Sequence, residues 1–456
     1  MRSKLLTPYW MPVWLFLAAI FIGAPLLRLP ACLVHPEQGF AWLDAIFTAT
    51  SAVCVTGLVV VDTGTFFTPV GQGVILVLIQ LGGLGIMTYT SLVFYLFGRR
   101  ISLADRTAVS QTLLSDPSFN LVRFVLRVVG ICLSVELCGA LLLLAQDPSG
   151  FHPWSALFHA ISAFCNAGFS LYADSLSHWR ADWGVNLVFM LLIVLGGLGF
   201  AVLIELGAVG RSLMRGGPRF VRLGPHLFTW RTRVVLSTSL WLILGGGVAI
   251  FLAEWAGGGE GPWNELLLSA LFQSVSCRTA GFNTVEIGHL TNVTLMLMLM
   301  LMFVGGSPGS TAGGIKTTTA RALLGYVVSK LKGGRQVIIG NAALSRSTRA
   351  KAISLAVFAM LLSLGATMAL QISEGGDISH DLARGLFLET LFEAVSAFGT
   401  VGLSTGLTSV LTDAGKAVIC VLMFIGRLGP IWLLSALQSW QTEPRYRIPE
   451  NDLPVG

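Results

Sequence analysis

The sequence predicts an all-α integral membrane protein, and three observations carry this prediction. Of the 456 residues, 54% are hydrophobic and only 11% are charged, whereas soluble domains carry roughly 25% charged residues. Eight apolar segments are long enough to cross a bilayer, which takes about 20 helical residues. A short local pattern also recurs four times along the chain. The composition argues against a soluble enzyme, a disordered chain, a nucleic-acid-binding tail and a secreted disulfide scaffold.

The apolar segments come in pairs. The predicted spanning segments are 9–29, 70–98, 121–145, 184–210, 233–256, 290–330 (interrupted), 349–373 and 413–440. The first of these lacks the small-residue cleavage site of a signal peptide, and similar segments follow it, so we interpret it as a spanning helix. Between the members of each pair lies a stretch of about 12 apolar residues, which is too short to span and is typical of a re-entrant helix. These shorter stretches are 41–52, 154–164, 264–276 and 384–397.

Each short stretch ends in a glycine-containing turn. We call these turns corner 1 (Cys54–Leu58), corner 2 (Cys165–Phe169), corner 3 (Arg278–Phe282) and corner 4 (Gly399–Leu403). Their glycines, at 57, 168, 281 and 402, are separated by 111, 113 and 121 residues. The spacing predicts four repeats of helix, re-entrant pore helix, glycine turn and helix, at 1–100, 101–220, 221–340 and 341–456. Such a chain of eight transmembrane helices and four re-entrant helices suggests a pseudo-fourfold arrangement around one pore.

Lysine and arginine concentrate on one predicted side of the membrane. The loops 99–127, 211–233 and 330–351 are basic, and the opposite side carries most of the acidic residues. Because basic loops stay in the cytoplasm, both termini of this multi-pass chain are expected to be cytoplasmic. This topology also explains the net charge of +6 without nucleic acid. The same loops leave open a second role in docking a regulatory partner or anionic lipid.

The glycine turns have the composition of a cation filter. A cation at membrane depth needs fixed oxygens in place of its water shell, and inward-facing backbone carbonyls supply them in potassium channels. Glycine adopts the required backbone angles without a side chain in the path, and the C-terminal end of a half-helix adds partial negative charge. The predicted cation-binding residues are Val55, Thr56, Gly57, Asn166, Ala167, Gly168, Thr279, Ala280, Gly281, Thr400, Val401 and Gly402.

These turns, together with Ser51–Thr65, Ser276–Thr284, Gly305–Thr317 and Gly426–Pro430, closely resemble the Ktr/Trk/HKT superfamily of cation transporters. The resemblance covers nearly the whole chain and is strongest to the membrane subunits of bacterial Ktr potassium uptake systems. It implies K⁺ as the transported ion, because sodium-preferring plant relatives carry Ser where Gly57 stands. It further implies a homodimer in the bacterial inner membrane on a cytosolic ring of nucleotide-binding regulatory subunits. The nucleotide would therefore bind the partner, and Na⁺ is left open as an activator.

The third repeat carries an interrupted second helix. Five glycines and a proline between 305 and 314 disfavour a continuous helix, and the resembling family has an intramembrane gating loop here, at 304–317. The pattern superficially looks like a phosphate-binding loop, but it is one residue too long and follows no strand. A simple kink that lets helices pack is the alternative. The predicted gate residues are Gly305, Gly306, Ser307, Pro308, Gly309, Ser310, Thr311, Ala312, Gly313, Gly314, Lys316 and Arg427.

Lys316 and Arg427 are basic residues within otherwise apolar segments, where charges usually face a water-filled path. A fixed positive charge about 6 Å from a permeating cation costs roughly 3 kcal/mol at an effective dielectric near 20, so Arg427 would form a barrier. A structural tie from Arg427 to the carbonyls of the loop is an alternative that is compatible with this role. Arg278, the first residue of corner 3, is expected to point away from the axis toward an acid such as Glu286.

Two other functional classes differ from a cation channel in the sequence features that they require. An ion-coupled alternating-access carrier of another solute remains the alternative, although carriers usually show inverted repeats and these four copies share one orientation. A membrane enzyme is disfavoured because the sequence has no HExxH or GxSxG motif and no paired intramembrane aspartates. The glycine clusters Leu81–Gly85 and Leu195–Gly199 are predicted to let helices pack closely.

Overall fold

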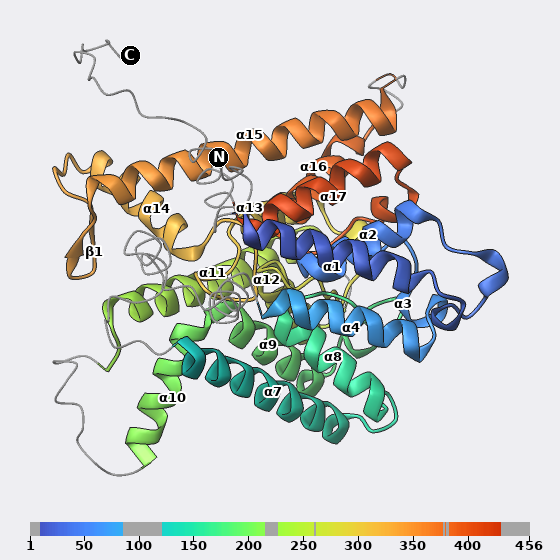
Figure 1. Ribbon diagram of the computed structural model, residues 1–456. Helices are drawn as coiled ribbons and strands as arrows, with labels where there is room; N and C mark the ends of the chain where they lie inside the picture. Colours follow the sequence, from blue (N-terminus) through green and yellow to red (C-terminus); the bar gives the residue numbers. More distant parts are fainter. Residues whose placement is uncertain are drawn as a thin grey trace, which may run out of the picture.

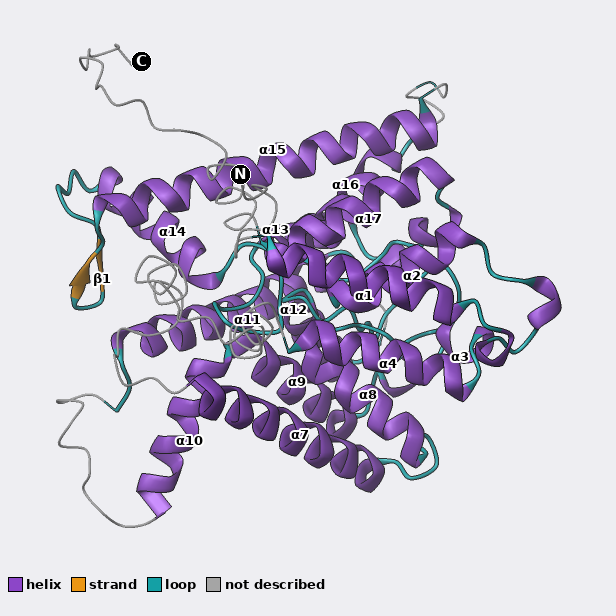
Figure 2. Cartoon of the chain, viewed as in Figure 1, coloured by secondary structure: helices purple, strands orange, loops and turns teal. Residues whose placement is uncertain are grey.

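The computed structural model describes residues 10–84, 121–214, 227–259, 261–376, 379 and 383–429. Helices make up nearly all the regular structure in these ranges, which confirms the predicted helical class (Figure 2). One antiparallel strand pair, β1 (Ile338–Ile339) and β2 (Ala342–Ala343), forms a small hairpin at the edge of the molecule. The predicted basic residues at 99, 100 and 106 and the polar tail 441–456 lie outside the described residues.

The longer helices fall in the predicted spanning segments. They are α1 (Met11–Leu27), α4 (Pro69–Gly83), α7 (Leu121–Gln146), α9 (Trp183–Leu198), α10 (Phe200–Met214), α11 (Trp230–Ala256), α13 (Asn292–Phe303), α14 (Thr317–Leu331), α15 (Arg346–Gly375) and α17 (Asp413–Leu428). Several begin at side-chain caps that accept a hydrogen bond from a backbone N–H of the first turn. These caps are Thr68 for α4, Asp182 for α9, Thr291 for α13 and Thr412 for α17.

Four shorter helices among the described residues lie inside this layer of long helices. They are α2 (Trp42–Cys54), α8 (Pro153–Cys165), α12 (Trp263–Ser276) and α16 (Leu386–Gly399). Most residues in the second half of each of these helices are buried. The remaining short elements are α3 (Thr63–Phe66) and the 3₁₀ turns Pro30–Cys32, Pro36–Gln38, Ser177–Trp179, Ile287–His289 and Leu407–Val410.

The contacts between these helices close a ring. Each short helix packs against the long helices that precede and follow it in sequence, as α2 does against α1 and α4. Each also packs against a long helix from another part of the chain: α2 against α17, α8 against α4, α12 against α9 and α16 against α13. Because the last of the long helices returns to the first short helix, the beginning and end of the described chain meet.

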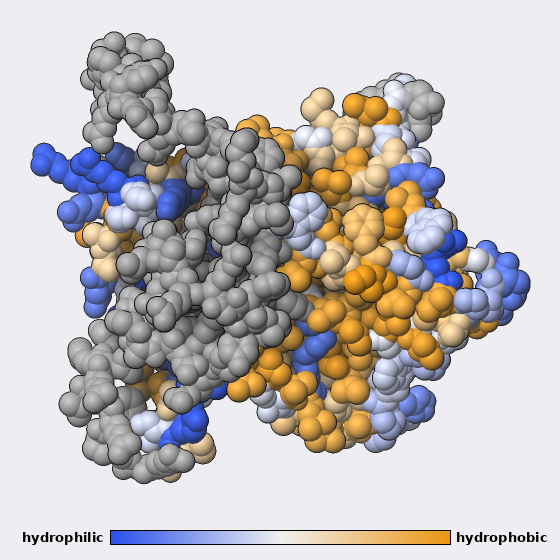
Figure 3. Space-filling model, in the orientation of Figure 1, coloured by the Kyte–Doolittle hydropathy of each residue, from blue (hydrophilic) through white to orange (hydrophobic). Residues whose placement is uncertain are grey.

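The outer surface is apolar in a broad band. In Figure 1 the long helices α7, α11 and α15 run in similar directions, with the hairpin and α10 at one end and α3 at the other. Figure 3 shows hydrophobic residues over the middle of this face and hydrophilic residues toward the two ends. Exposed leucines such as Leu133, Leu137 and Leu141 on α7 contribute to the apolar surface. Among the described residues, α7, α11 and α15 are each long and apolar enough to cross a membrane.

The prediction of one continuous helix over 184–210 is wrong. The chain bends by 110° between α9 and α10, at Gly199. Gly199 has a φ of +92°, and a Cβ added there would lie only 2.6 Å from the carbonyl oxygen of Pro308. The backbone N–H of Phe200 donates to Gly309 O at 3.0 Å. The helix is therefore broken where the loop 304–317 packs against it.

The predicted packing role of the glycine clusters is confirmed. An added Cβ would lie 2.1 Å from Val53 O at Gly82 and 1.9 Å from Phe164 O at Gly196. Both carbonyls belong to the last turn of a short helix. Only a residue without a side chain lets the long helix approach this closely.

We therefore predict that Gly196→Ala destabilises the protein. The added methyl group has to displace backbone, and overpacking of this kind costs about 1–3 kcal/mol. The measurement is the apparent Tm of the detergent-purified protein, followed by loss of the monodisperse size-exclusion peak on heating. Gly245→Ala is the matched control, because no atom lies within 4 Å of the added methyl on α11. Equal Tm values for the two variants would contradict the close packing.

Candidate functional site

The four corners begin where the short helices end. At corners 1, 2 and 4, the residue after the helix is left-handed, and the next N–H bonds back to a carbonyl in the last turn, which is a common helix-ending motif. These left-handed residues are Val55 (φ 56°), Asn166 (φ 59°) and Thr400 (φ 51°). The backbone bonds are Thr56 N to Ser51 O (2.8 Å), Ala167 N to Ser162 O (2.7 Å) and Val401 N to Ser396 O (2.8 Å).

Corner 3 is built differently. Helix α12 ends at Ser276, and Cys277 continues in right-handed helical geometry. The left-handed residue is Thr279, and Ala280 N donates to Ser276 O at 2.9 Å. This closure spans one residue fewer than at the other corners. Arg278 lies inside the tightened turn.

The four predicted filter glycines meet at one place. Gly57, Gly168, Gly281 and Gly402 all have positive φ, from 72° to 93°. A Cβ added to each would collide with a carbonyl oxygen of the next corner: the distances are 2.5 Å from Gly57 to Ala167 O, 2.9 Å from Gly168 to Ala280 O, 2.6 Å from Gly281 to Val401 O and 2.0 Å from Gly402 to Thr56 O. The contacts run from corner 1 to 2, 3 and 4 and back to 1. The turns therefore surround a common centre that is lined by backbone.

Four serines that the sequence analysis did not select hold the corners in place. Ser51 and Ser396 accept hydrogen bonds from the N–H groups of Gly57 and Gly402, each at 3.1 Å. Ser162 donates to Phe169 O at 2.8 Å, and Ser276 donates to Phe282 O. All four hydroxyls are buried. Their signal in the sequence was a serine at a similar place in each short apolar stretch.

The loop 304–317 lies directly against corner 4. A Cβ added to Gly313 would lie 2.2 Å from Thr400 Oγ1, and one added to Gly314 would lie 3.3 Å from Gly399 Cα. Gly305 faces the other limb of the loop, since its added Cβ would lie 2.2 Å from Gly313 O. The predicted gate residues between 305 and 316 therefore form one folded segment beside the corners, and Arg427 approaches it from α17.

Backbone hydrogen bonds join this loop to the broken end of α9. Ser307 N donates to Gly197 O at 2.9 Å, and Thr311 N donates to Gly196 O at 3.3 Å. Within the loop, Thr317 N donates to Gly306 O at 3.0 Å, and Thr317 Oγ1 donates to Ser307 Oγ at 3.1 Å. The loop is a fixed part of the interior in this conformation.

Three cationic side chains, those of Lys316, Arg427 and Arg278, donate hydrogen bonds to carbonyls of this segment. Lys316 Nζ donates to Ala312 O at 2.7 Å and to Gly313 O at 3.3 Å. Arg427 donates from Nη1 to Thr311 O and from Nη2 to Gly82 O, so it joins the loop to the end of α4. The structural tie that was one of the two interpretations of Arg427 is therefore present.

Arg278 has a different partner from the one expected. Arg278 is 6% exposed, and its guanidinium donates to Ser239 O and Gly305 O, each at 3.4 Å. Glu286, suggested as its acid, instead lies 3.3 Å from His289 at the surface. Backbone carbonyls cannot be recognised as partners in a sequence, because every residue carries one, and the loop that supplies Gly305 O lies 27 residues away.

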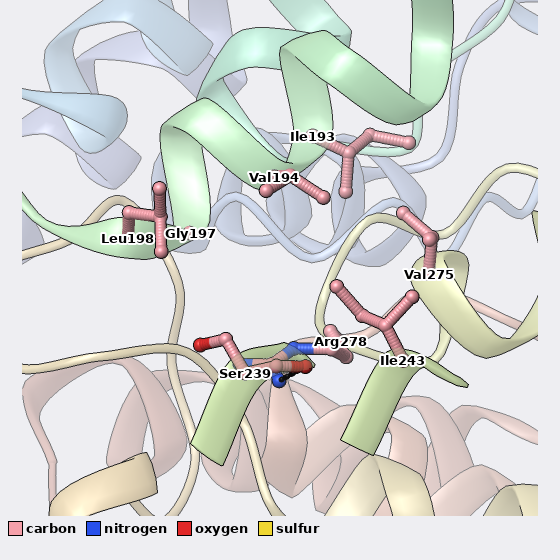
Figure 4. Close-up of a pocket in the computed structure, with 8 residues that line it drawn as sticks. All are labelled: Ile193, Val194, Gly197, Leu198, Ser239, Ile243, Val275 and Arg278. Atoms are coloured by element: carbon pink, nitrogen blue, oxygen red, sulfur yellow. Dashed lines mark hydrogen bonds between the residues drawn. The ribbon is translucent and has the colours of Figure 1, made fainter. Parts of the chain in front are cut away.

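A small crevice borders Arg278. Its walls come from α9 (Ile193, Val194, Gly197 and Leu198), α11 (Ser239 and Ile243) and α12 (Val275), and Arg278 lies across it from Ile193 and Val194 (Figure 4). Most of the lining side chains are apolar, and Ser239 and Arg278 supply the polar part. The guanidinium is thus held by carbonyls at one side of a mainly apolar space.

The far ends of the short helices are braced by polar contacts. Asp44 of α2 and Lys416 of α17 form an ion pair at 2.7 Å. Beside α8, hydrogen bonds from Ser149 Oγ, Trp179 Nε1 and Gly150 N hold the pKa of Asp147 well below its usual range. Burial raises the pKa of Tyr172, whose hydroxyl lies 2.8 Å from Ser155 Oγ. Among the described residues, no group of three or more His, Cys, Asp and Glu side chains is arranged to hold a metal ion.

Comparisons with known proteins agree with this architecture. The family described as "TrkH: Cation transport protein" matches residues 24–438. The Ktr system potassium uptake protein B of Bacillus subtilis is 38% identical over 97% of this chain and 95% of its own length. The protein of the same name from Vibrio alginolyticus is 35% identical over 97% and 93%. The potassium/sodium uptake protein NtpJ of Enterococcus hirae is 32% identical over 98% and 97%.

The fold is similar to that of a solved structure. The potassium transporter TrkH from Vibrio parahaemolyticus superimposes with a TM-score of 0.73 at 19% identity, covering 96% of this chain and 87% of that one. The match to the family spans most of the chain, and the relatives are similar along nearly their full lengths. This chain is therefore a membrane protein of the TrkH/Ktr family of cation transporters and not an enzyme.

Proposed function

We propose that this chain is the potassium-translocating membrane subunit of a Ktr-type uptake system. The observation that carries the proposal is the closed circuit of four glycine corners, each against a carbonyl of the next. The relatives named as potassium uptake proteins support K⁺ as the ion. On this proposal the four predicted repeats, 1–100, 101–220, 221–340 and 341–456, each contribute one corner to a single pore.

The proposed selectivity filter consists of the twelve corner residues named from the sequence. Their backbone carbonyls would replace the water around a dehydrated K⁺. The short helices end at the corners, so the negative ends of their dipoles also favour a cation there. Gly57 gives corner 1 no side chain at this position. In the family that this chain resembles, sodium-preferring members carry Ser here, so glycine favours K⁺ over Na⁺. Na⁺ stays open as an activator; one relative is named as a potassium/sodium uptake protein, a name that concerns uptake of the two ions.

We predict that Gly168→Ser and Gly281→Ser each abolish potassium uptake. A side chain at either position collides with the next corner at 2.9 or 2.6 Å from a carbonyl oxygen, and positive φ is unfavourable for serine. The measurement is growth of an uptake-deficient host on limiting K⁺, followed by K⁺ flux in proteoliposomes, where we expect a loss of at least about tenfold, equal to 1.4 kcal/mol. Gly207→Ser is the control, since it meets open space. Undiminished rescue by both filter variants would refute the filter.

We further propose that the loop 304–317 is the gate, with Lys316 and Arg427 as its positive elements. Arg427 links the loop at Thr311 O to Gly82 O. This contact supports a latch, and its charge supplies an electrostatic barrier to a cation. Gate opening would then require that the guanidinium leave at least one of these carbonyls.

Neutralising Arg427, or shortening the segment 305–314, is predicted to raise ion flux. The removed barrier of roughly 3 kcal/mol sets an upper limit near a hundredfold. The measurement is initial K⁺ flux into proteoliposomes at equal protein density for Arg427→Gln. Arg211→Gln serves as the charge control, because within the described part of the chain Arg211 donates to Gly207 O in its own exposed helix turn. Flux equal to the unsubstituted protein in a correctly folded Arg427→Gln variant would count against the latch.

The assembly proposed for this chain follows its relatives' designation as parts of a Ktr system. We propose a homodimer in the bacterial inner membrane with both termini cytoplasmic. A cytosolic ring of regulatory subunits would carry the nucleotide and act on the gate. The basic loops on the predicted cytoplasmic side support this orientation.

A further inference from the structure

We propose that Arg278 couples corner 3 to the loop 304–317, so that ion occupancy of the filter influences the position of the gate. The proposal rests on the function proposed above for both segments. It makes Arg278 a positioning residue, because its side chain reaches the gate and not the path of the ion.

At the filter end, Arg278 belongs to the corner itself. It lies three residues before Gly281, and its backbone N–H donates to Val275 O at 3.1 Å. Corner 3 is also the one with the tightened closure, from Ala280 N to Ser276 O. A shift in the carbonyls of this turn therefore moves the Arg278 backbone with it.

At the gate end, the guanidinium holds the first residue of the glycine segment. Nη2 donates to Gly305 O and Nη1 donates to Ser239 O on α11, so the side chain bridges the loop and a fixed helix. Gly305 is confined on its other sides: its added Cβ would lie 2.2 Å from Gly313 O and 3.3 Å from Thr279 Cγ2. A movement at Gly305 is thereby passed to Gly313, which lies against corner 4.

The surroundings make this bridge the main restraint on the guanidinium. Arg278 forms no ion pair with any residue in the described part of the chain. The adjoining crevice offers mostly apolar walls, as Figure 4 shows. A buried guanidinium needs hydrogen-bond acceptors, so the carbonyls of Ser239 and Gly305 determine where it sits.

The other corners carry no comparable side chain. Cys54, Cys165 and Gly399 occupy the equivalent place, three residues before the glycine. Cys165 Sγ contacts Gln80 Oε1 of α4 at 3.6 Å. The long cationic side chain is therefore found at the corner whose following helix is interrupted by the loop. Among the four corners, corner 3 alone combines a long hydrogen-bond donor with a loop that this donor can hold.

The test measures how accessible the loop is to a thiol reagent in the presence of two different cations. The full-length protein carrying Ser310→Cys is reconstituted in proteoliposomes, and modification of that cysteine by a membrane-impermeant thiol reagent is timed in K⁺ and in choline. Chains without Ser310→Cys are treated in parallel to subtract the native cysteines. The rate is expected to differ at least about threefold between the two ions. With Arg278→Met added, the two rates are expected to become equal, and Arg278→Lys, which reaches fewer carbonyls, should give an intermediate difference.

Each outcome decides the proposal. Equal rates in K⁺ and choline for Ser310→Cys alone would overturn the coupling, and so would a difference that persists in monodisperse Arg278→Met protein. If Arg278→Met does not fold, the lysine variant decides: an undiminished difference overturns the coupling, and a reduced one supports it. K⁺ flux is measured in parallel in vesicles that carry the protein without Ser310→Cys. Flux without coupling refutes only this inference, whereas absence of flux counts against the proposed function.

Discussion

The constraint on which this structure depends is that irregular backbone at membrane depth must find hydrogen-bond partners inside the protein. The four corners and the loop 304–317 are the irregular segments of the interior. Several of their N–H groups donate to the ends of the short helices, to buried serines such as Ser51 and Ser396, and to carbonyls of the broken helix α9. The helices that surround these segments provide an apolar exterior and hold them in place.

The same constraint explains the partners of the interior cations. Arg278, Lys316 and Arg427 all donate to backbone carbonyls of the loop. The last four carbonyls of a helix have no partner within it, and glycine-rich turns leave others unpaired. Cationic donors satisfy those carbonyls and add positive charge beside the four corners. The loop and corner 3 are therefore joined by a charged hydrogen bond, from Arg278 to Gly305 O, as well as by packing.

Glycine serves two physical purposes in this chain. At Gly57, Gly168, Gly281 and Gly402 it allows positive φ and close approach between corners. At Gly82 and Gly196 it lets a long helix touch the carbonyl end of a short one. Both purposes depend on spacing more than on overall sequence. This is consistent with a fold shared with the Vibrio parahaemolyticus transporter at 19% identity.

The sequence by itself determined the helical class, the positions of the long and short helices and the four equivalent glycines. The length of apolar segments and a repeated local sequence pattern can both be read from the order of residues alone. It also marked the interrupted helix at 305–314. Only the tertiary structure decided that α9 breaks at Gly199, that Arg278 binds Gly305 O rather than Glu286, and that Arg427 joins Thr311 to Gly82. These features depend on backbone carbonyls, which every residue carries and which no residue type reveals, so only the folded chain shows which of them meet a donor.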